Sequence, residues 1–477
     1  MTRIQRTAAM IAMVLLPCTT LAQDHNYWNN QFGSRSALMG GAVVGGVRDT
    51  SAVFYNPGAL GFIDNQSLSV SANALRVERS VIENGAGDGR DLDSDTLSVV
   101  PLLISGITFL NDSGSDVLGY GILTRNSYQL EISERRDVVG NILNSGTFPG
   151  EENYIGQISA DTKLDEYWGG VGYSHRFNEQ ISAGLTTFVA VRSQSFNEQT
   201  FARVISTDTF AASTSNLSSN YDFYNVRLLW KGGVSVDCNP VKIGLTVTTP
   251  SIDLFGDGTS AGDLTVTNVD IDGDGLPDTF VADDRQDDLD AEIRSPLSIA
   301  AGLDWQITDQ TVIAVTGEWF TALGAYDVMT PEARDFIRPP GVATGLFNSQ
   351  DFLTVLDAAD DVFNVALAVE HSFTETLKGI LSFRTDYSNG ASIAEQGKDR
   401  GITDWNVYHV TVGGTYRRER SELALGLVYS FADKDDAQQV VNFDNPSEDT
   451  FLFGRPGSAS ANYDALSIIL GYTYYFS

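Results

Sequence analysis

The chain has little cysteine and no long hydrophobic run. Two cysteines occur among 477 residues, and one of them, Cys18, lies in a segment with the character of a secretory signal. Cleavage would leave Cys238 alone, so neither an intramolecular disulfide nor a cysteine-based metal site is expected. No stretch beyond the signal approaches the ~18 consecutive apolar residues of a membrane-spanning helix, so a helical membrane protein is not expected either.

Histidine is also scarce. A hydrolytic triad needs a nucleophile, a histidine and an orienting acid or amide in one cluster, and no spacing nominates such a group. The glycines between Gly40 and Gly46 are not followed by Gly-Lys-Ser/Thr, so they do not form a phosphate loop. We therefore do not expect an enzyme. The four histidines are His25, His175, His371 and His409.

Basic residues are outnumbered by acidic ones. The sequence has 30 Lys and Arg against 62 Asp and Glu, a formal net charge of −32. Nucleic-acid binding needs a basic surface, so nucleic acid is excluded as a partner. The acidic residues gather between the predicted strands, which leaves the strands compatible with lipid.

Residues 1–22 are predicted to form a secretory signal peptide. Arg3 and Arg6 precede an apolar run over 8–16 that is too short to span a bilayer. Small residues around Ala22 provide a cleavage site. Export out of the cytoplasm is therefore expected.

The mature sequence is dominated by alternation of apolar and polar residues. About fourteen segments alternate with a period of two, each near the 9–11 residues or more of a tilted membrane strand. The predicted strand cores are 66–77, 96–109, 117–133, 164–176, 180–194, 222–236, 240–248, 293–306, 310–323, 362–373, 376–387, 405–417, 421–433 and 463–476. This pattern predicts an all-β protein.

The connections between these strands alternate between short turns and long polar segments. Short periplasmic turns and long external loops are typical of outer-membrane barrels. Residues 65–477 are therefore predicted to form a transmembrane antiparallel β-barrel of about 14 strands with long extracellular loops, in preference to a soluble β-sandwich. The long segments are 134–163, 195–221, 249–292, 324–361 and 434–462.

The predicted strands have one side for lipid and one for the lumen. In the last strand Leu466, Leu470 and Tyr474 share the outward side. The opposite side of the strands carries charges of both signs and is predicted to be close to neutral or slightly basic. These lumenal charges are Arg125, Arg192, Arg227, Lys231, Lys242, Arg294, Lys378, Arg384, Glu166, Asp304, Glu318, Glu370 and Asp386.

A basic lumen residue can meet the carboxylate of an amphipathic ligand. Arg227 and Arg384 are the predicted contacts, with Phe188 and His409 as further lumenal contacts. The alternative is a ladder of salt bridges that only fills the interior. Apolar lumen positions predicted to hold a ligand tail are Val100, Leu102, Ile104, Leu123, Phe188, Leu229, Val312, Ala366, Ile380 and Val407.

The segment 34–62 is apolar, dense in glycine and too broken to be a strand or a membrane helix. Glycine permits close backbone approach, so this segment is expected to pack inside a barrel. Asp49, Thr50 and Ser51 are expected to cap a short helical turn that runs through Tyr55 and ends before Pro57.

The sequence Tyr55-Asn56-Pro57-Gly58-Ala59-Leu60 resembles the FadL/TodX-type family of outer-membrane transporters, although Gly and Ala are exchanged relative to the family's Asn-Pro-Ala signature. The resemblance implies a fourteen-stranded barrel closed by an N-terminal hatch, here residues 23–64. It also implies passive transport of long-chain fatty acids or other hydrophobic compounds, with release through a gap in the wall. A static plug is the alternative to a moving hatch. The implied hatch residues are Gly40, Gly41, Gly45, Gly46, Asn56, Pro57 and Gly58.

An acidic loop in the segment 249–292 has the spacing of a calcium loop. Carboxylates at positions 1, 3, 5 and 9 with glycine at position 6 match that pattern. Val281 stands where a bidentate acid belongs, so weak binding of a structural Ca²⁺ is expected, and no other cofactor. The predicted ligands are Asp270, Asp272, Asp274 and Asp278.

The sequence thus predicts a barrel in the bacterial outer membrane that passes hydrophobic or amphipathic molecules. The rival is a non-transporting barrel that acts as a structural or secretion-complex scaffold, and a general porin is disfavoured because a hatch would block a water channel. Expected partners are a hydrophobic small molecule, outer-membrane lipid and lipopolysaccharide, and the barrel-assembly machinery. Ser477 follows the aromatic residue on which assembly signals usually end.

Overall fold

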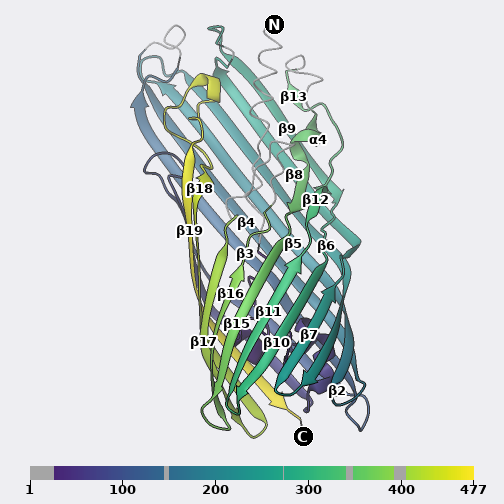
Figure 1. Cartoon of the computed structure of the whole chain (residues 1–477). Coiled ribbons are helices and arrows are strands. Elements are labelled where there is room, and N and C mark those ends of the chain that lie inside the picture. The colour runs from purple at the N-terminus through teal and green to yellow at the C-terminus, as the bar shows by residue number, and fades with distance from the viewer. Residues whose placement is uncertain (1–25, 144–149, 272, 340–347, 391–403, 477) are drawn as a thin grey trace.

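The computed structural model describes residues 26–143, 150–271, 273–339, 348–390 and 404–476. Its main element is a closed antiparallel barrel of 14 strands (Figure 1), in which β1 pairs with both β2 and β19. The predicted fold class and strand number are confirmed. The barrel strands are β1 (Ser67–Glu83), β2 (Leu92–Phe109), β3 (Asp116–Gly140), β4 (Glu152–Arg176), β5 (Ile181–Ser206), β6 (Ala212–Cys238), β7 (Val241–Thr248), β10 (Ser298–Thr308), β11 (Thr311–Phe320), β15 (Val362–Ser372), β16 (Leu377–Asp386), β17 (Val407–Arg418), β18 (Ser421–Gln438) and β19 (Ser458–Tyr475).

Further strands extend the wall at the end with the long hairpins, called here the outer end. The upper half of β6 pairs with β8, which pairs with β9, while β12 and β14 form a separate two-stranded sheet. One short helix, α4, and one 3-10 turn, η3, also lie at this end (Figure 1). The bounds are β8 (Ile252–Val269), β9 (Asp278–Asp290), β12 (Leu323–Met329), β13 (Ile337–Arg338), β14 (Val355–Ala359), α4 (Ser349–Leu353) and η3 (Glu448–Thr450).

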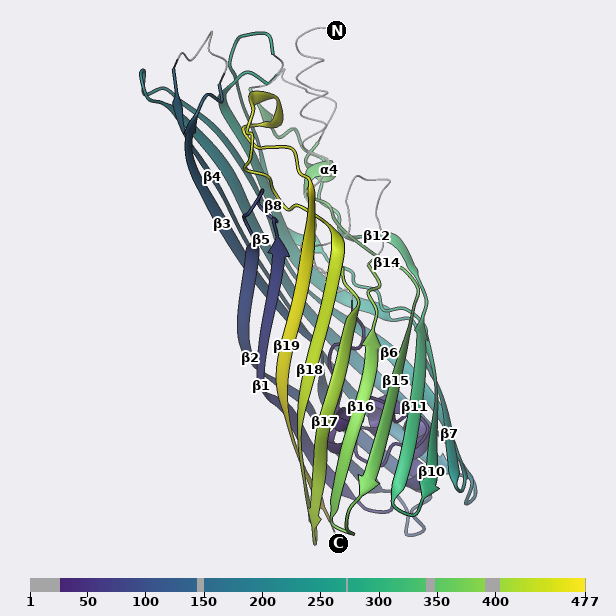
Figure 2. The ribbon, with the colours of Figure 1, turned by 60° about the vertical axis from the view of Figure 1, so that its left-hand side comes forward.

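Three segments predicted as long loops are largely strand. The β3–β4 ladder continues to the pair Gly140 and Glu152, and the β5–β6 ladder to Ile205 and Ala212. Much of 249–292 is the β8–β9 hairpin. These hairpins make one side of the barrel much taller than the other (Figure 2). Outward side chains there are polar because they face water, so the apolar alternation disappears while the hydrogen-bonded ladder continues.

Below the tall hairpins the outer surface carries a belt of exposed apolar side chains. Trp305 and Trp319 are 48% and 39% exposed and point outward. Among the residues that the structure describes, no helix is long and apolar enough to cross a bilayer. A closed barrel with an apolar belt is the architecture of outer-membrane proteins, and the predicted location fits it. Other belt residues are Leu185, Val189, Leu245, Leu367, Leu425, Leu466, Leu470 and Tyr474.

The inward and outward sides exchange at mid-height in part of the wall. The pairing register shifts between Asn73 and Leu75 in β1 and between Thr124 and Asn126 in β3. In β2 the pairing with β1 skips Leu102, and on the far side of this bulge Ile104 is 53% exposed, so its predicted lumenal position is wrong. An extra residue in a strand moves every later side chain to the other face, which a period-two pattern cannot anticipate.

The interior contains two large apolar clusters. The cluster near the outer end joins Phe280, Phe336, Phe443 and Phe451, which come from β9 and from connections between strands. The second cluster lies at the opposite, inner end and includes the N-terminal residues. Hydrophobic packing therefore fills part of the lumen at both ends.

Candidate functional site

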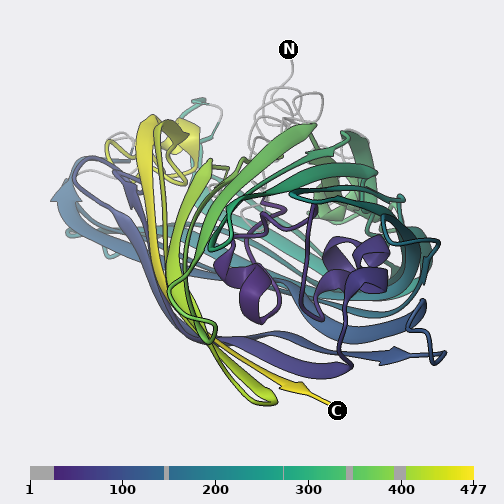
Figure 3. The ribbon, with the colours of Figure 1, turned by 60° about the horizontal axis from the view of Figure 1, so that its bottom comes forward.

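The N-terminal segment, residues 26–64, lies inside the inner half of the barrel (Figure 3). It forms the helices α2 (Ser34–Leu38) and α3 (Ala52–Tyr55) and the 3-10 helix η1 (Pro57–Phe62). Its apolar side chains share one buried cluster with wall residues such as Leu229. The segment thus occupies the place that the family resemblance gives to a hatch, and movement of a hatch remains a prediction.

Hydrogen bonds of Asp49 and Asn56 shape this segment, but no side chain caps α3, contrary to the prediction for Asp49, Thr50 and Ser51. Asp49 accepts hydrogen bonds from the backbone nitrogens of Ser36 and Ser51 at 2.9 and 3.0 Å, and α3 ends before Pro57. The Asn56 side chain accepts from Gly58 N at 3.0 Å and donates to Val44 O at 2.9 Å. It also donates to the wall at Val234 O, 3.3 Å away, so this one amide joins two turns of the segment to β6.

Close backbone contact explains several glycines of the segment. A Cβ on Gly45 would lie 2.8 Å from Leu303 Cα, and one on Gly58 would lie 2.7 Å from Gly233 O. Gly40 and Gly41 have φ of 62° and 81°, values that residues other than glycine rarely adopt. Tight packing therefore accounts for these glycines, and their implied role in a moving hatch is untested.

The wall has its own glycines opposite the segment, which the sequence reading missed. A Cβ on Gly244 would lie 1.8 Å from Val44 O, and one on Gly184 would lie 2.4 Å from Pro57 O. Glycine within a strand indicates either a bulge or the close approach of another backbone. The sequence therefore marks these positions, but it does not identify the segment that packs against them.

A buried ion pair also joins the segment to the wall. Arg35 Nε lies 2.5 Å from Glu370 Oε2, and both side chains are at most 6% exposed. Burial opposes the charge on Arg35, but Glu370 and Asp304 outweigh it and raise the pKa of Arg35 above its usual value. The pair therefore stays charged and removal of either partner would leave a buried charge.

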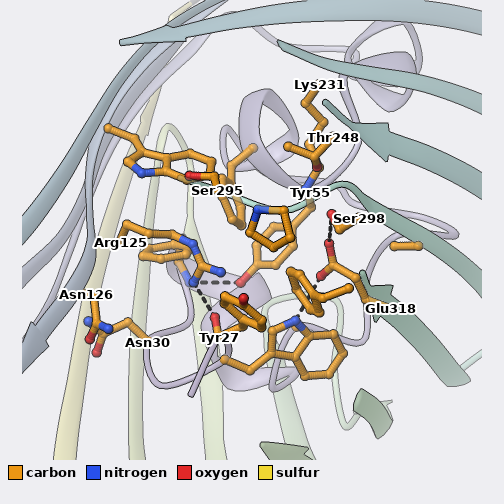
Figure 4. A pocket seen from close by; sticks show the side chains of 18 of the residues that line it. Tyr27, Asn30, Tyr55, Arg125, Asn126, Lys231, Thr248, Ser295, Ser298 and Glu318 are labelled. Carbon is orange, nitrogen blue, oxygen red and sulfur yellow. Dashed lines mark hydrogen bonds between the residues drawn. The ribbon is translucent and has the colours of Figure 1, made fainter. Parts of the chain in front are cut away.

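Above the segment lies a lumenal cavity of about 1030 Å³, including space open to solvent (Figure 4). Aromatic rings form much of its lining. Phe54 of α3 packs against Trp168 with ring centroids 6.0 Å apart, and Tyr27 stacks on Phe320 at 4.3 Å. Phe188 lies behind them, 5.4 Å from Trp168. This lining suits an apolar or aromatic ligand.

Five cationic side chains and two carboxylates line the cavity. Arg227 Nη2 lies 2.7 Å from Glu166 Oε1, and Arg227 Nε donates to Ser295 Oγ at 2.9 Å. Glu318 accepts from Trp28 Nε1 at 2.9 Å. Lys231 is different, because no hydrogen bond or ion pair joins its ammonium to any described residue. The lining cations are Arg125, Arg192, Arg227, Lys231 and Arg294.

The predicted substrate contacts are spread over the lumen. Arg227 lines the cavity, and Phe188 supports its aromatic lining. Arg384 donates instead to the backbone oxygens of Trp28 and Asn29, at 3.2 and 3.1 Å. His409 is the cross-strand partner of Arg384, and its Nδ1 lies 2.6 Å from Ser430 Oγ. The structure therefore brings Arg384 and His409 together, but apart from Arg227 and Phe188.

Lys231 and Arg125 were placed on the lumenal side from the sequence, but nothing singled them out among the lumenal charges. Their distinguishing property is the lack of an acidic partner among the described residues, which depends on pairing between distant strands. Tyr27 and Trp28, which also line the cavity, follow the predicted signal peptide and carry no strand pattern. No sequence signal would have found them.

The wall beside the cavity has an incomplete seam. β2 and β3 pair only from Leu103 opposite Leu123 to Phe109 opposite Val117. Above this, no register joins 92–102 of β2 to 124–140 of β3, although β2 still pairs with β1 and β3 with β4. Pro101, which has no backbone N–H, lies where the pairing stops.

The lower end of this seam meets the cavity. Arg125 and Asn126, directly above the last β2–β3 pair, line it. Thr124 pairs with the exposed Tyr167, and Leu97 and Val99 of β2 are exposed along the seam, so the lower part of the seam lies along the upper part of the apolar belt. At the top of the seam, Arg90 Nη1 lies 3.3 Å from Glu134 Oε1. Between these limits Thr124 Oγ1 donates to Pro101 O, and Glu131 N donates to Ser94 Oγ at 3.1 Å, so side-chain hydrogen bonds bridge the seam where the backbone ladder is missing.

The acidic loop forms a tight turn in the described residues. Asp270 accepts from the backbone nitrogens of Asp274 and Gly275 at 3.1 and 2.9 Å. Asp272 lies outside the described residues. Within the described part of the chain, no group of three or more His, Cys, Asp or Glu is arranged to hold a metal. Calcium binding by Asp270, Asp274 and Asp278 remains a prediction.

Comparison with known proteins finds no matching protein-family model and no matching curated protein. Solved structures do match. A Pseudomonas aeruginosa FadL homologue is 14% identical with a TM-score of 0.58, covering 95% of this chain and 100% of its own. The Pseudomonas putida toluene transporter TodX is 12% identical with a TM-score of 0.59, covering 94% and 99%.

A third similar structure is the Ralstonia pickettii toluene transporter TbuX. It is 10% identical with a TM-score of 0.54, and the match covers 94% of this chain and 99% of that one. At these identities the similarity establishes the fold over almost the whole chain. The expected FadL/TodX-type architecture is thereby confirmed.

Proposed function

We propose that this barrel passively carries hydrophobic and amphipathic compounds, including molecules of the long-chain fatty-acid type, across the bacterial outer membrane. The observation that carries the proposal is the position of the aromatic cavity, which adjoins the lower end of the β2–β3 seam. Proteins of the same fold that are described as transporters of toluene support it.

The proposed route leaves the lumen sideways. Directly below the cavity, the N-terminal segment fits against wall glycines and is held by the Arg35–Glu370 ion pair. The incomplete seam needs no displacement of this segment. A hydrophobic ligand that leaves along the upper part of the belt enters lipid directly, which is favourable because its apolar surface never returns to water.

The test fills the cavity and measures ligand binding. Ala300 is 1% exposed and lines the cavity, whereas its neighbour Ala301 is exposed on the lipid side. Binding of toluene and of decanoate to the detergent-purified barrel is measured by calorimetry. We expect Ala300→Trp to weaken both at least tenfold and Ala301→Trp to leave both unchanged.

Two results would contradict the proposal. Equal binding by both variants would show that the cavity is not the ligand site. No saturable binding by the folded wild-type barrel would favour the alternative, in which the protein is a structural or secretion-complex scaffold.

A further inference from the structure

The cavity carries more positive charge than its own carboxylates balance. Of its five cations, Arg227 is paired with Glu166, and Arg294 Nε lies 2.7 Å from Glu292 Oε1. Arg192 lies 3.7 Å from Glu166 and shares that acid. Lys231 and Arg125 have no carboxylate partner within ion-pair distance among the described residues. Such an excess is unusual in a chain with a net charge of −32.

Of these two cations, Lys231 has the larger desolvation cost, because it is only 4% accessible to solvent. Its Nζ lies 4.6 Å from the centroid of the Phe54 ring and makes no hydrogen bond to a described residue. A ring face stabilises a cation only in part, and burial of an unpaired ammonium is costly. A bound anion would offset this cost.

Arg125 approaches the same ring from another strand. Its guanidinium carbon is 5.9 Å from the Phe54 centroid and 5.6 Å from that of Trp168. One nitrogen, Nη1, donates to the backbone oxygen of Tyr27. The guanidinium has five N–H donors, so the others remain for a ligand. Figure 4 shows Arg125 and Lys231 entering the cavity from separate parts of the wall.

The lining around these cations is aromatic. Phe54, Trp168 and Phe320 contribute rings to the cavity, and the first two already stand edge to face. Such a lining accepts a further ring in stacked or edge-on contact. A rigid planar ligand also loses less rotational freedom on binding than a flexible chain.

We infer that the preferred ligand of this cavity is an aromatic carboxylate, with its carboxylate between Lys231 and Arg125 and its ring among Phe54, Trp168 and Phe320. This inference rests on the proposed function and narrows its substrate class. Lys231 binds the carboxylate, and the aromatic side chains of the lining pack against the ring. Arg227 is already neutralised by Glu166 and holds Ser295, so it stabilises the wall.

The test compares phenylacetate with phenylacetamide, which has the same shape without the charge. Calorimetry on the detergent-purified barrel is run at about pH 7, where the carboxyl is ionised. We expect phenylacetate to bind about tenfold more tightly than the amide, as a charge-assisted hydrogen bond allows. Lys231→Met removes this preference by weakening phenylacetate alone, and Lys231→Arg largely retains it.

The matched control is Lys378→Met, because Lys378 is a lumenal lysine that lies outside the cavity and pairs with Glu370 at 3.5 Å. It is expected to leave both affinities unchanged. Octanoate serves as a flexible carboxylate and is expected to bind more weakly than phenylacetate.

Equal affinity of the wild type for phenylacetate and phenylacetamide would overturn the inference while leaving the proposed function intact. An equal loss of affinity for both ligands in Lys231→Met would also overturn it, since the loss would then come from altered packing and not from the missing charge. Tighter binding of octanoate would refute the aromatic preference. Absence of binding by toluene, decanoate and all three probes would instead refute the proposed function.

Discussion

At the scale of single residues, glycines in the wall decide whether the N-terminal segment can dock. A side chain on Gly244 would collide with the backbone oxygen of Val44, whereas a Cβ on the neighbouring wall residue Gly232 meets nothing within 4 Å. We expect Gly244→Val to release the segment at a cost of about 1–3 kcal/mol, the range of overpacked sites, and Gly232→Val to have no such effect.

Trypsin provides the measurement, because Arg35 and Arg48 lie in the segment. Cleavage at these arginines is expected to be much faster in the folded Gly244→Val barrel than in the wild type or in Gly232→Val. Equal protection of all three would mean that the segment does not depend on this contact.

Arg384 shows what the sequence can and cannot predict at this scale. Alternation correctly placed it on the lumenal side, and it is buried there. Its partners, the backbone oxygens of Trp28 and Asn29, are more than 350 residues away in the chain. No local pattern encodes such a contact, so its predicted role in ligand binding could not be weighed against a structural one.

A second residue-scale prediction follows from those contacts. Removal of a charged donor to buried carbonyls costs about 1.5–3 kcal/mol, so Arg384→Met is expected to loosen residues 27–30. Hydrogen exchange of the backbone amides of Trp28 and Asn29 should accelerate, and any fall in affinity should be equal for phenylacetate and phenylacetamide. A large loss of affinity with unchanged exchange would restore Arg384 as a ligand contact.

At the scale of elements, the sequence predicts the lipid-facing strands well and the tall hairpins poorly. In lipid, one face of a strand must be apolar, which produces a clear period of two. The β5–β6 ladder continues above the belt through Asn197 opposite Asn220. The outer face of the strands is in contact with water there, so outward positions accept any polar residue. The hydrogen-bonded ladder persists there without a pattern that sequence analysis can detect.

The N-terminal segment yields an element-scale prediction about movement. Thr50 Oγ1 lies 2.5 Å from Ser105 Oγ of β2, which brings the two residues within reach of a disulfide. In a background with Cys238→Ser, Thr50→Cys with Ser105→Cys would tether the segment to the wall. Because the proposed route leaves through the seam, we expect the oxidised protein to retain toluene uptake by cells.

A reductant provides the internal control for this tether. Uptake that is lost on oxidation and restored on reduction would show that the segment must shift, as a moving hatch does. Uptake that is independent of redox state would identify the segment as a static plug.

At the scale of the whole molecule, the distribution of outward side chains determines how deep the barrel sits in the membrane. β5 crosses both environments. Leu185 belongs to the apolar belt and is 51% exposed, whereas Ser195 lies further along the same outward side, in the tall hairpin. Its pairing partner Asp222 is charged, so lipid is not expected to reach this level.

This arrangement predicts different costs for the same substitution at two positions of β5. Leu185→Arg places a charge in lipid and is expected to cost about 2–4 kcal/mol if it lies near the bilayer midplane. Ser195→Arg places the charge in water beside Asp222 and is expected to cost less than about 0.5 kcal/mol. Urea-dependent folding into phospholipid vesicles measures both. Equal, large costs would place the tall hairpins inside the bilayer, and the seam would then open within the lipid core instead of along the upper part of the belt.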